Sequence, residues 1–244
     1  MSDPETLSKS SPPSLAVVIG ATGGVGAALL TQLQSDARFA HVIGLSRSSH
    51  PALDLLDEAS IAQAAAHVAD SARANGLDLR LVFDATGILH GNGHQPEKSW
   101  SQLDAAQMAQ VFAINAVGPA LLMKHFLPLL PRQGKAVFAT LSAKVGSIGD
   151  NRLGGWYAYR ASKAALNQLV HTAAIELARR HPAAICVALH PGTVHSALSA
   201  PFAKTGLDVR PPTEAAQRLL SVLDDLQASD SGGFFNHDGS ALPW

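Results

Sequence analysis

Short apolar runs alternate with longer segments of helical composition along most of the chain. A short apolar run that ends at a glycine or a polar residue is typical of a strand buried on both faces of a sheet. Such runs lie at residues 15–19, 41–45, 79–83, 135–141, 184–189 and 233–236. Helical segments end at residue 34 and then lie near 60–75, 103–130, 156–180 and 213–227. The alternation predicts an α/β fold with a parallel sheet and right-handed crossovers.

The helical segment at 103–130 has two unusual features in its middle. Gly118 and Pro119 come together there, and a proline inside a helical pattern either kinks the helix or starts a new one. Asn115 lies just before them. If it is buried, its amide needs hydrogen-bond partners. The alternative is an asparagine that caps a helix.

A single domain is expected over residues 15–244, because no linker and no internal repeat beyond the strand–helix alternation interrupts the pattern. Residues 1–14 are polar and contain prolines, so we predict a disordered N-terminal tail. This tail lacks the basic and apolar regions of a signal peptide. No apolar run reaches the ~18 residues needed to span a bilayer. We therefore expect a cytoplasmic protein.

Composition excludes several classes of protein. The 18 basic and 19 acidic residues nearly cancel, and no basic run would attract nucleic acid or an anionic membrane. The single cysteine, Cys186, rules out an intramolecular disulfide. Because it lies in an apolar run, a buried and inert thiol is favoured over a reactive one.

The turn after the first strand is rich in glycine and opens a helix. Glycines let the backbone approach a pyrophosphate, and the N-terminus of a helix offers free N–H groups and positive potential. The alternative is an ordinary tight turn, but the flanking strand and helix favour dinucleotide binding. The residues of this turn are Gly20, Ala21, Thr22, Gly23, Gly24, Val25 and Gly26.

The end of the second strand indicates which dinucleotide binds. An acidic residue there would bind the ribose 2′-hydroxyl of NAD and repel the 2′-phosphate of NADP, but the sequence is Ser46, Arg47 and Ser48. The planar fork of Arg47 can pair with a phosphate, and either serine can add a hydrogen bond. We predict a preference for NADP(H), with NAD(H) possible. The alternative is that Arg47 is only a surface arginine.

Tyr159 and Lys163 are the strongest catalytic candidates. Residues four apart share a helix face, about 6 Å apart along the axis. A free tyrosine has a pKa near ~10, and a neighbouring cation brings it toward the working range. The alternative is a solvated helix face. The other tyrosine, Tyr157, points to a different face from Lys163.

Histidines in the polar loop at 88–100 raise the question of a metal. His90 and His94 are four residues apart and could share a metal only on a helix. Gly91 and Gly93 argue against a helix there. We expect no metal and a solvated loop or pocket rim.

Many of these positions, taken in order along the chain, match one family. The chain resembles the short-chain dehydrogenases/reductases over nearly its whole length after the tail, and residues 145–201 and 234–239 resemble the subgroup of C-factor proteins and sniffer-type carbonyl reductases. The matching residues are Gly20, Gly24, Gly26, Asp54, Asp84, Ala85, Thr86, Gly87, Asn115, Ser142, Tyr159, Lys163, Pro191 and Gly192.

Some positions depart from the family pattern. Ile19 stands where many members have threonine, and Asp84 and Thr86 replace the asparagine and alanine of N-x-A-G. The separation of Ser142 and Tyr159, 159 − 142 = 17, is longer than usual. We expect the extra loop at 150–156 to reshape one wall of the substrate pocket.

The resemblance implies a doubly wound Rossmann-type domain with a mainly parallel sheet of about seven strands and the ligand at the strands' carboxyl ends. It implies reversible hydride transfer between a nicotinamide and a small carbonyl or alcohol substrate. Tyr159 would donate the proton, and Ser142 would hydrogen-bond the same oxygen. Lys163 would lower the tyrosine pKa and hold the ribose. Asn115 would position a water that connects Lys163 to solvent.

The resemblance also places the remaining cofactor contacts and leaves alternatives open. Asp54 and Leu55 would lie near the adenine, and further contacts would come from Ala85, Thr86, Gly87, Pro191, Gly192 and Val194. Substrate walls are expected at 90–95, 143–156 and 194–202. A dinucleotide-binding signalling or regulatory protein of the C-factor type is the alternative to an enzyme.

Self-association is also implied by the resemblance. A dimer or tetramer would be built on the helices at 103–130 and 156–180, where Ala164 and Ala165 allow close helix approach. The alternative is that these alanines pack on the protein's own sheet.

Overall fold

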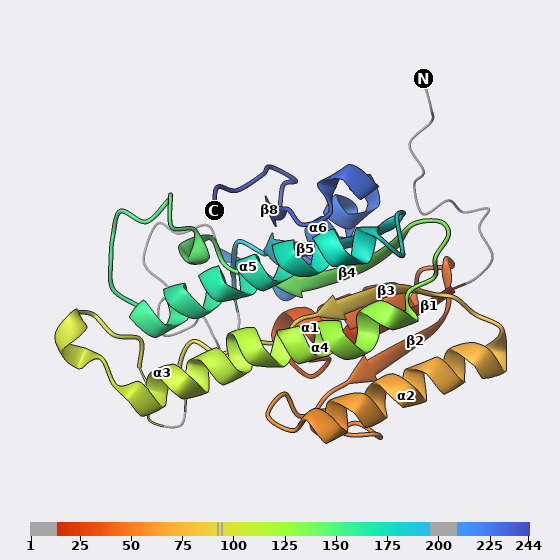
Figure 1. The fold of residues 1–244 in the computed structure, drawn as a ribbon, viewed down its shortest axis with the longest axis horizontal. Coiled ribbons are helices and arrows are strands. Elements are labelled where there is room, and N and C mark those ends of the chain that lie inside the picture. Colours follow the sequence, from red (N-terminus) through yellow and green to blue (C-terminus); the bar gives the residue numbers. More distant parts are fainter. Residues whose placement is uncertain (1–13, 92, 94, 196–208) are drawn as a thin grey trace.

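The computed structural model describes residues 14–91, 93, 95–195 and 209–244 (Figure 1). Its centre is a parallel sheet of six strands in the order β2-β1-β3-β4-β5-β8. The strand count is therefore six in the described sheet, where about seven were expected. The strands are β1 (Ser14–Ile19), β2 (Phe39–Leu45), β3 (Leu79–Asp84), β4 (Ala136–Leu141), β5 (Ala184–His190) and β8 (Phe234–Asn236). A separate parallel pair joins β6 (Thr193–Val194) to β7 (Val209–Arg210).

Helices cover both faces of the sheet (Figure 1). One layer contains α2 (Glu58–Asn75), α4 (Gly118–Phe126) and α5 (Tyr157–Ala178), and the other contains α1 (Gly24–Gln34) and α6 (Pro212–Asp225). Alternate residues of β1 belong to different cores: Leu15 and Val17 pack under the first layer, and Ala16 and Val18 under the second. The sheet is therefore buried on both faces, which confirms the α/β prediction.

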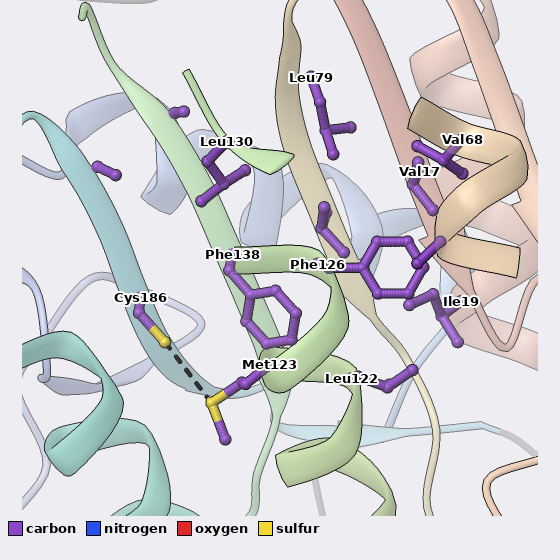
Figure 2. Close-up of a cluster of buried hydrophobic side chains, with 14 of the residues drawn as sticks. Val17, Ile19, Val68, Leu79, Leu122, Met123, Phe126, Leu130, Phe138 and Cys186 are labelled. Carbon is purple, nitrogen blue, oxygen red and sulfur yellow. Dashed lines mark hydrogen bonds between the residues drawn. The ribbon is translucent and has the colours of Figure 1, made fainter. Parts of the chain in front are cut away.

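The larger core lies between α4 and the central strands (Figure 2). Phe126 of α4 and Phe138 of β4 are both completely buried there. The Sγ atom of Cys186 is 3.9 Å from the Sδ atom of Met123. Burial raises the pKa of the Cys186 thiol to about 12, which agrees with the predicted inert thiol.

The segment predicted as helical at 103–130 is one nearly continuous helical run. It starts as α3 (Ala105–Phe112), passes through a π-helical turn at Ala113–Val117 and continues as α4. Pro119 lies in the first turn of α4, where its missing N–H does little harm. By length and composition alone, Ala105–Leu129 could cross a membrane, although this segment is not an uninterrupted apolar run. Here the run packs against α2 and α5.

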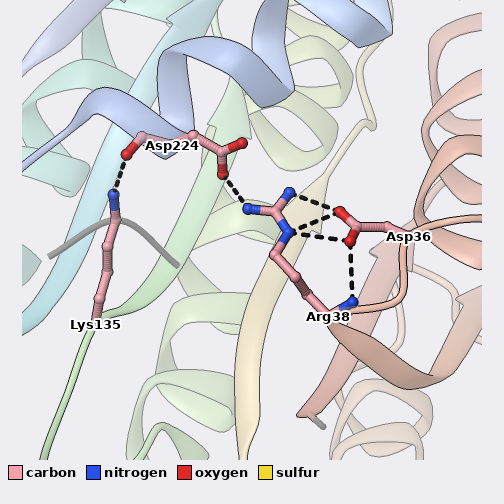
Figure 3. A network of polar contacts seen from close by, with 4 residues as sticks. All are labelled: Asp36, Arg38, Lys135 and Asp224. Atoms are coloured by element: carbon pink, nitrogen blue, oxygen red, sulfur yellow. Dashed lines mark hydrogen bonds and ion pairs between the residues drawn. The ribbon is translucent and has the colours of Figure 1, made fainter. Parts of the chain in front are cut away.

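The amino ends of the strands are tied together by a polar network (Figure 3). Arg38, just before β2, binds Asp36 through two nitrogens and also donates to Asp224 at the end of α6, at 2.7 Å. Lys135, just before β4, donates to the backbone oxygen of Asp224 at 2.7 Å. The hydrogen bond to Asp36 raises the pKa of Arg38. These contacts stabilise the sheet on the side away from the strands' carboxyl ends.

Some predicted boundaries need comment. Ser14 was assigned to the tail but is the first, buried residue of β1. Residues 1–13 lie outside the described part of the chain, as do His94 and the portion of the predicted substrate wall at 196–202.

Candidate active site

The glycine-rich turn lies at the carboxyl end of β1. Gly20 has φ +81, and its N–H and that of Ala21 donate to the Leu45 oxygen of β2 at 2.9 and 3.2 Å. A Cβ atom on Gly26 would lie 2.2 Å from the Gly20 oxygen, so no larger residue fits there. Gly23 precedes α1 and has no side chain to cap it, so the first N–H groups of the helix are open to an anion.

The turn after β3 packs directly on this glycine turn, where the strand order reverses. A Cβ atom on Gly20 would lie 3.1 Å from the Ala85 carbonyl and 3.2 Å from Thr86 Cγ2. One residue later, a Cβ atom on Gly87 would lie 3.4 Å from Lys163 Nζ. The turn at 84–87 therefore connects the predicted pyrophosphate site to the predicted catalytic lysine.

The corner after β2 is held by serines. Ser46 is buried, and its Oγ atom is 3.1 Å from Ser48 Oγ, while Ser49 Oγ accepts the Ser46 N–H at 2.9 Å. Arg47 is exposed at this corner. None of the ion pairs formed between described residues uses it. The guanidinium is therefore available to a ligand.

The residues predicted to lie near the adenine sit just before α2. Asp54 is partly buried, and its Oδ1 accepts the Leu56 N–H at 3.0 Å. Leu55 packs against Gly118 of α4, where a Cβ atom would lie 2.8 Å from Leu55 Cβ. This segment is joined to the corner after β2 through Leu53, whose N–H donates to the Ser46 oxygen at 2.8 Å.

Tyr159 and Lys163 are both buried near the start of α5, with 9% and 3% of their surface exposed. They are not on a solvated helix face. The Tyr159 ring packs with Leu89 and Ala143, and it meets the Trp156 ring edge-on with centroids 6.2 Å apart. Lys163 Nζ donates to the Leu141 oxygen at the end of β4, at 2.7 Å.

The electrostatics of the pair differ from the prediction. Burial raises the pKa of Tyr159 to about 12, and no attraction to Lys163 offsets it in this arrangement. Burial also lowers the pKa of Lys163 to about 8, against the opposing effect of Asp84. The prediction of a lowered tyrosine pKa was wrong because it used the four-residue spacing alone, and spacing carries no information on burial. At neutral pH the phenol is protonated and can serve as a proton donor.

Ser142 follows β4 and is oriented by a residue that the sequence analysis missed. Its Oγ atom donates to Asn167 Oδ1 at 2.6 Å, and both side chains are buried. Asn167 is the third member of a four-residue series on α5, after Tyr159 and Lys163. This continued spacing was the signal available in the sequence. Asn167 Nδ2 is buried and has no partner among the described residues.

Asn115 is buried in the π-helical turn and caps no helix. Its Oδ1 accepts the Ile88 N–H and its Nδ2 donates to the Ile88 oxygen, both at 2.8 Å. Nδ2 also lies 3.1 Å from Ser162 Oγ of α5. The amide therefore fixes the chain just after Gly87 against the helix that carries Lys163. That Asn115 also positions a water stays a prediction.

The carboxyl end of β5 supplies the last predicted cofactor contacts. Pro191 and Gly192 follow β5, and Gly192 has φ +78. A Cβ atom on Gly192 would lie 2.7 Å from both Arg210 Nη1 and His237 Cδ2. These two side chains form a hydrogen bond, with Arg210 Nη1 3.1 Å from His237 Nε2. Sequence reasoning missed this pair, because Arg210 and His237 lie far along the chain. Val194, in β6, is buried.

The loops at 88–100 and 143–156 meet at the start of α5. Glu97 is buried and its Oε2 accepts the Ala158 N–H at 3.2 Å. A cavity of about 480 Å³ opens on the face of α5 that carries Tyr157 and Arg160, not on the face of Tyr159. The predicted wall at 143–156 thus lines a hollow on the far side of the helix as well.

Comparisons with known proteins agree with this geometry. A family model described as short chain dehydrogenase matches residues 14–206. The C-signal of Myxococcus xanthus is 37% identical over 142 residues, covering 58% of this chain and 81% of that protein. The NADPH-bound carbonyl reductase from chicken fatty liver superposes with a TM-score of 0.81 at 28% identity, covering 95% and 99% of the two chains. The carbonyl reductase Sniffer of D. melanogaster has the same fold, with a TM-score of 0.80 at 23% identity and 96% and 100% coverage.

Proposed function

The chain belongs to the short-chain dehydrogenase family, and from this premise we propose that it is an NADP(H)-dependent carbonyl reductase with Tyr159 as the general acid. The observation that carries the proposal is the burial of Ser142, Tyr159 and Lys163 at one edge of the sheet, beside the turn at 84–87. The similar carbonyl reductase from chicken fatty liver is bound to NADPH, which supports the cofactor.

The residues present fit a dinucleotide. Only glycine fits at position 26, and the open N-terminus of α1 suits a pyrophosphate. Arg47 and Ser46 would hold a 2′-phosphate, and Asp54 and Leu55 would face the adenine. Lys163 would hold the ribose of the nicotinamide. The remaining contacts would come from Ala85, Thr86, Gly87, Pro191, Gly192 and Val194.

The chain's own groups would manage the proton. The cofactor supplies a hydride to the carbonyl carbon when it is bound. Tyr159 is protonated at neutral pH, so it donates its proton to the carbonyl oxygen as the alkoxide develops. Ser142 would turn its hydroxyl from Asn167 to the same oxygen, and the Lys163 ammonium would stabilise the phenolate that remains. The products are an alcohol and a tyrosinate, which regains a proton from solvent.

A signalling or regulatory role of the C-factor type is the second candidate. The 37% identity to C-signal favours it. A protein that only binds a dinucleotide has no need of a buried serine, tyrosine and lysine together. We therefore place catalysis first, and a signalling role could accompany it.

A panel of small ketones and aldehydes, assayed with NADPH and with NADH, tests the proposal. We expect at least one carbonyl to be reduced, with one alcohol formed for each NADPH oxidised, and faster turnover with NADPH than with NADH at low concentration. Binding of NADPH without reduction of any carbonyl in a broad panel would favour the regulatory role. Failure to bind either cofactor would contradict both candidates.

We also propose that the protein is a homo-oligomer. Val117 and Ile175 are large apolar residues with about half of their surface exposed, at 52% and 53%, and lie on the helical run and on α5. Association through these helices would cover them. Light scattering at micromolar concentration should give the mass of a dimer or tetramer, and a mass of one chain would contradict the proposal.

A further inference from the structure

Asp84, the last residue of β3, has a completely buried carboxylate held by three donors. Thr140 Oγ1 donates to Asp84 Oδ2 at 2.6 Å. Thr86 donates to Oδ1 twice, from its Oγ1 at 2.6 Å and from its N–H at 3.0 Å. An ionised carboxylate accepts and does not donate, so three donors favour its charged form. This arrangement is unusual because an unpaired buried charge is expensive.

The strand ladder places this carboxylate beside the catalytic lysine. Asp84 and Thr140 are directly opposite each other in the parallel pairing of β3 and β4. Leu141 is the next residue of β4, and its backbone oxygen accepts a hydrogen bond from the Lys163 ammonium at 2.7 Å. Asp84 and Lys163 are not within ion-pair contact in the described structure. They are held instead by consecutive residues of the same strand.

Each charge affects the other through the buried space between them. Asp84 favours the ammonium form of Lys163 and opposes the effect of burial on its pKa. Burial raises the pKa of Asp84, while the threonine hydrogen bonds and Lys163 lower it. The other ionisable group on this face, Tyr159, is neutral at working pH. Lys144, from the turn that packs on α5, points toward Asp150 at 3.7 Å and is half exposed.

We propose that Asp84 is a positioning residue: its fixed, buried carboxylate keeps the Lys163 ammonium charged and thereby sets the pH above which proton donation by Tyr159 fails. The consequence for catalysis rests on the function proposed above, whereas the electrostatic effect of Asp84 on Lys163 does not. The competing explanation is that Asp84 only fastens β3 to β4 through Thr140. The two differ in what removal of the charge does to Lys163.

Asp84→Asn separates them, because it removes the charge and keeps the shape. Thr140→Val is the matched control: it removes the cross-strand hydrogen bond and leaves the carboxylate with its two hydrogen bonds from Thr86, and the ¹³Cγ signal of Asp84 would show that it stays ionised. The pKa of Lys163 would be measured by NMR titration of protein labelled with ¹³C-lysine, with the signal assigned by Lys163→Arg. We expect Asp84→Asn to lower the pKa of Lys163 by at least about one unit, which is a tenfold weaker binding of its proton. Thr140→Val should change it by much less.

Two results would overturn the proposal. An unchanged Lys163 titration in a folded Asp84→Asn variant would leave Asp84 with a structural role only. If that variant does not fold, the ¹³Cγ signal of Asp84 in the wild type decides: an ionised carboxylate at pH 7 supports the proposal, and a protonated one contradicts it.

Activity is a separate readout of the effect of Asp84 on Lys163. If the protein reduces carbonyls, the alkaline decline of kcat should move to lower pH in Asp84→Asn together with the Lys163 titration. A decline that stays in place while the lysine pKa falls would contradict the catalytic part of the proposal. If the wild type reduces no carbonyl, the function proposed above fails, while the lysine titration still decides whether Asp84 keeps Lys163 charged.

Discussion

Replacing Arg47 with alanine should weaken NADPH binding strongly and leave NADH binding nearly unchanged. The guanidinium is exposed after β2 and takes part in none of the ion pairs among the described residues, so it is available to a phosphate. Ser46 and Ser48 form the same corner, with their hydroxyls 3.1 Å apart. NADPH and NADH differ only in the 2′-phosphate. A loss of affinity confined to NADPH would therefore show that Arg47 contacts this phosphate.

The expected size of this effect follows from the geometry of the corner. A hydrogen bond to a charged group contributes roughly 1.5–3 kcal/mol, and exposure to water and salt favours the lower end for Arg47. One such bond corresponds to about tenfold in affinity, and a bidentate contact to about a hundredfold. Because the contact is exposed, the NADPH preference should shrink as the salt concentration rises.

The assay is calorimetric titration of both cofactors into the wild type and Arg47→Ala. Arg73→Ala is a matched control, since it removes an exposed arginine from α2 that is paired with Asp70. We expect the control to bind both cofactors as the wild type does. Equal or tighter binding of NADH by the wild type would refute the argument from the end of β2. An equal loss for both cofactors in Arg47→Ala would show that the arginine does not select the phosphate.

Three further predictions concern the same site. Gly26→Ala should reduce NADPH affinity at least tenfold in a calorimetric titration, because the new methyl group would lie 2.2 Å from the Gly20 oxygen. The kcat of carbonyl reduction should fall as pH rises through about 8, because Lys163 is charged only below its pKa; a rate that stays flat to about pH 10 would contradict this. Asn167→Leu should lower kcat by about tenfold and leave NADPH binding unchanged in steady-state and binding assays, because Ser142 loses the side chain that holds its hydroxyl in the site before it turns to the substrate oxygen.

The sequence predicted the central strands of the sheet well because they are buried on both faces. The runs at 15–19 and 184–189 are apolar at every position, and all of these residues are buried. They could therefore be recognised as strands without knowing which strands they pair with. The edges of the elements were less certain. Ser14 is polar yet pairs with Phe39, and only the neighbouring strand shows that it belongs to the sheet.

The helical run around Asn115 shows a second limit. Periodicity predicted a helix with an interruption at Pro119, but the structure places a π-helical turn before the proline and a nearly continuous run through it. A π-turn changes the hydrogen-bond pattern without changing composition, so apolar spacing cannot detect it. The use of Asn115 to clamp Ile88 depends on the loop that follows β3, the preceding strand, and this contact spans 27 positions of the chain.

Contacts between distant segments account for most of what the sequence did not predict in the site. Tyr159, Lys163 and Ser142 were predicted from spacing and resemblance, and they lie at the expected edge of the sheet. The partners of these residues were not predicted. Asn167 meets Ser142 across 25 positions, and Thr140 meets Asp84 across 56. Burial of the helix face, which reverses the expected pKa shift of Tyr159, also depends on packing that no local pattern contains.

The most direct test of the central claim uses the two tyrosines of the chain. Tyr159→Phe keeps the ring and removes the proton donor, and Tyr157→Phe makes the same change two residues away, where the side chain lines the cavity on the other face of α5. Single-turnover reduction of a carbonyl by bound NADPH would be measured in both variants. We predict a rate at least ~100-fold below wild type for Tyr159→Phe with NADPH still bound, and a near-normal rate for Tyr157→Phe. Near-normal turnover by Tyr159→Phe would contradict the assignment of Tyr159 as the general acid.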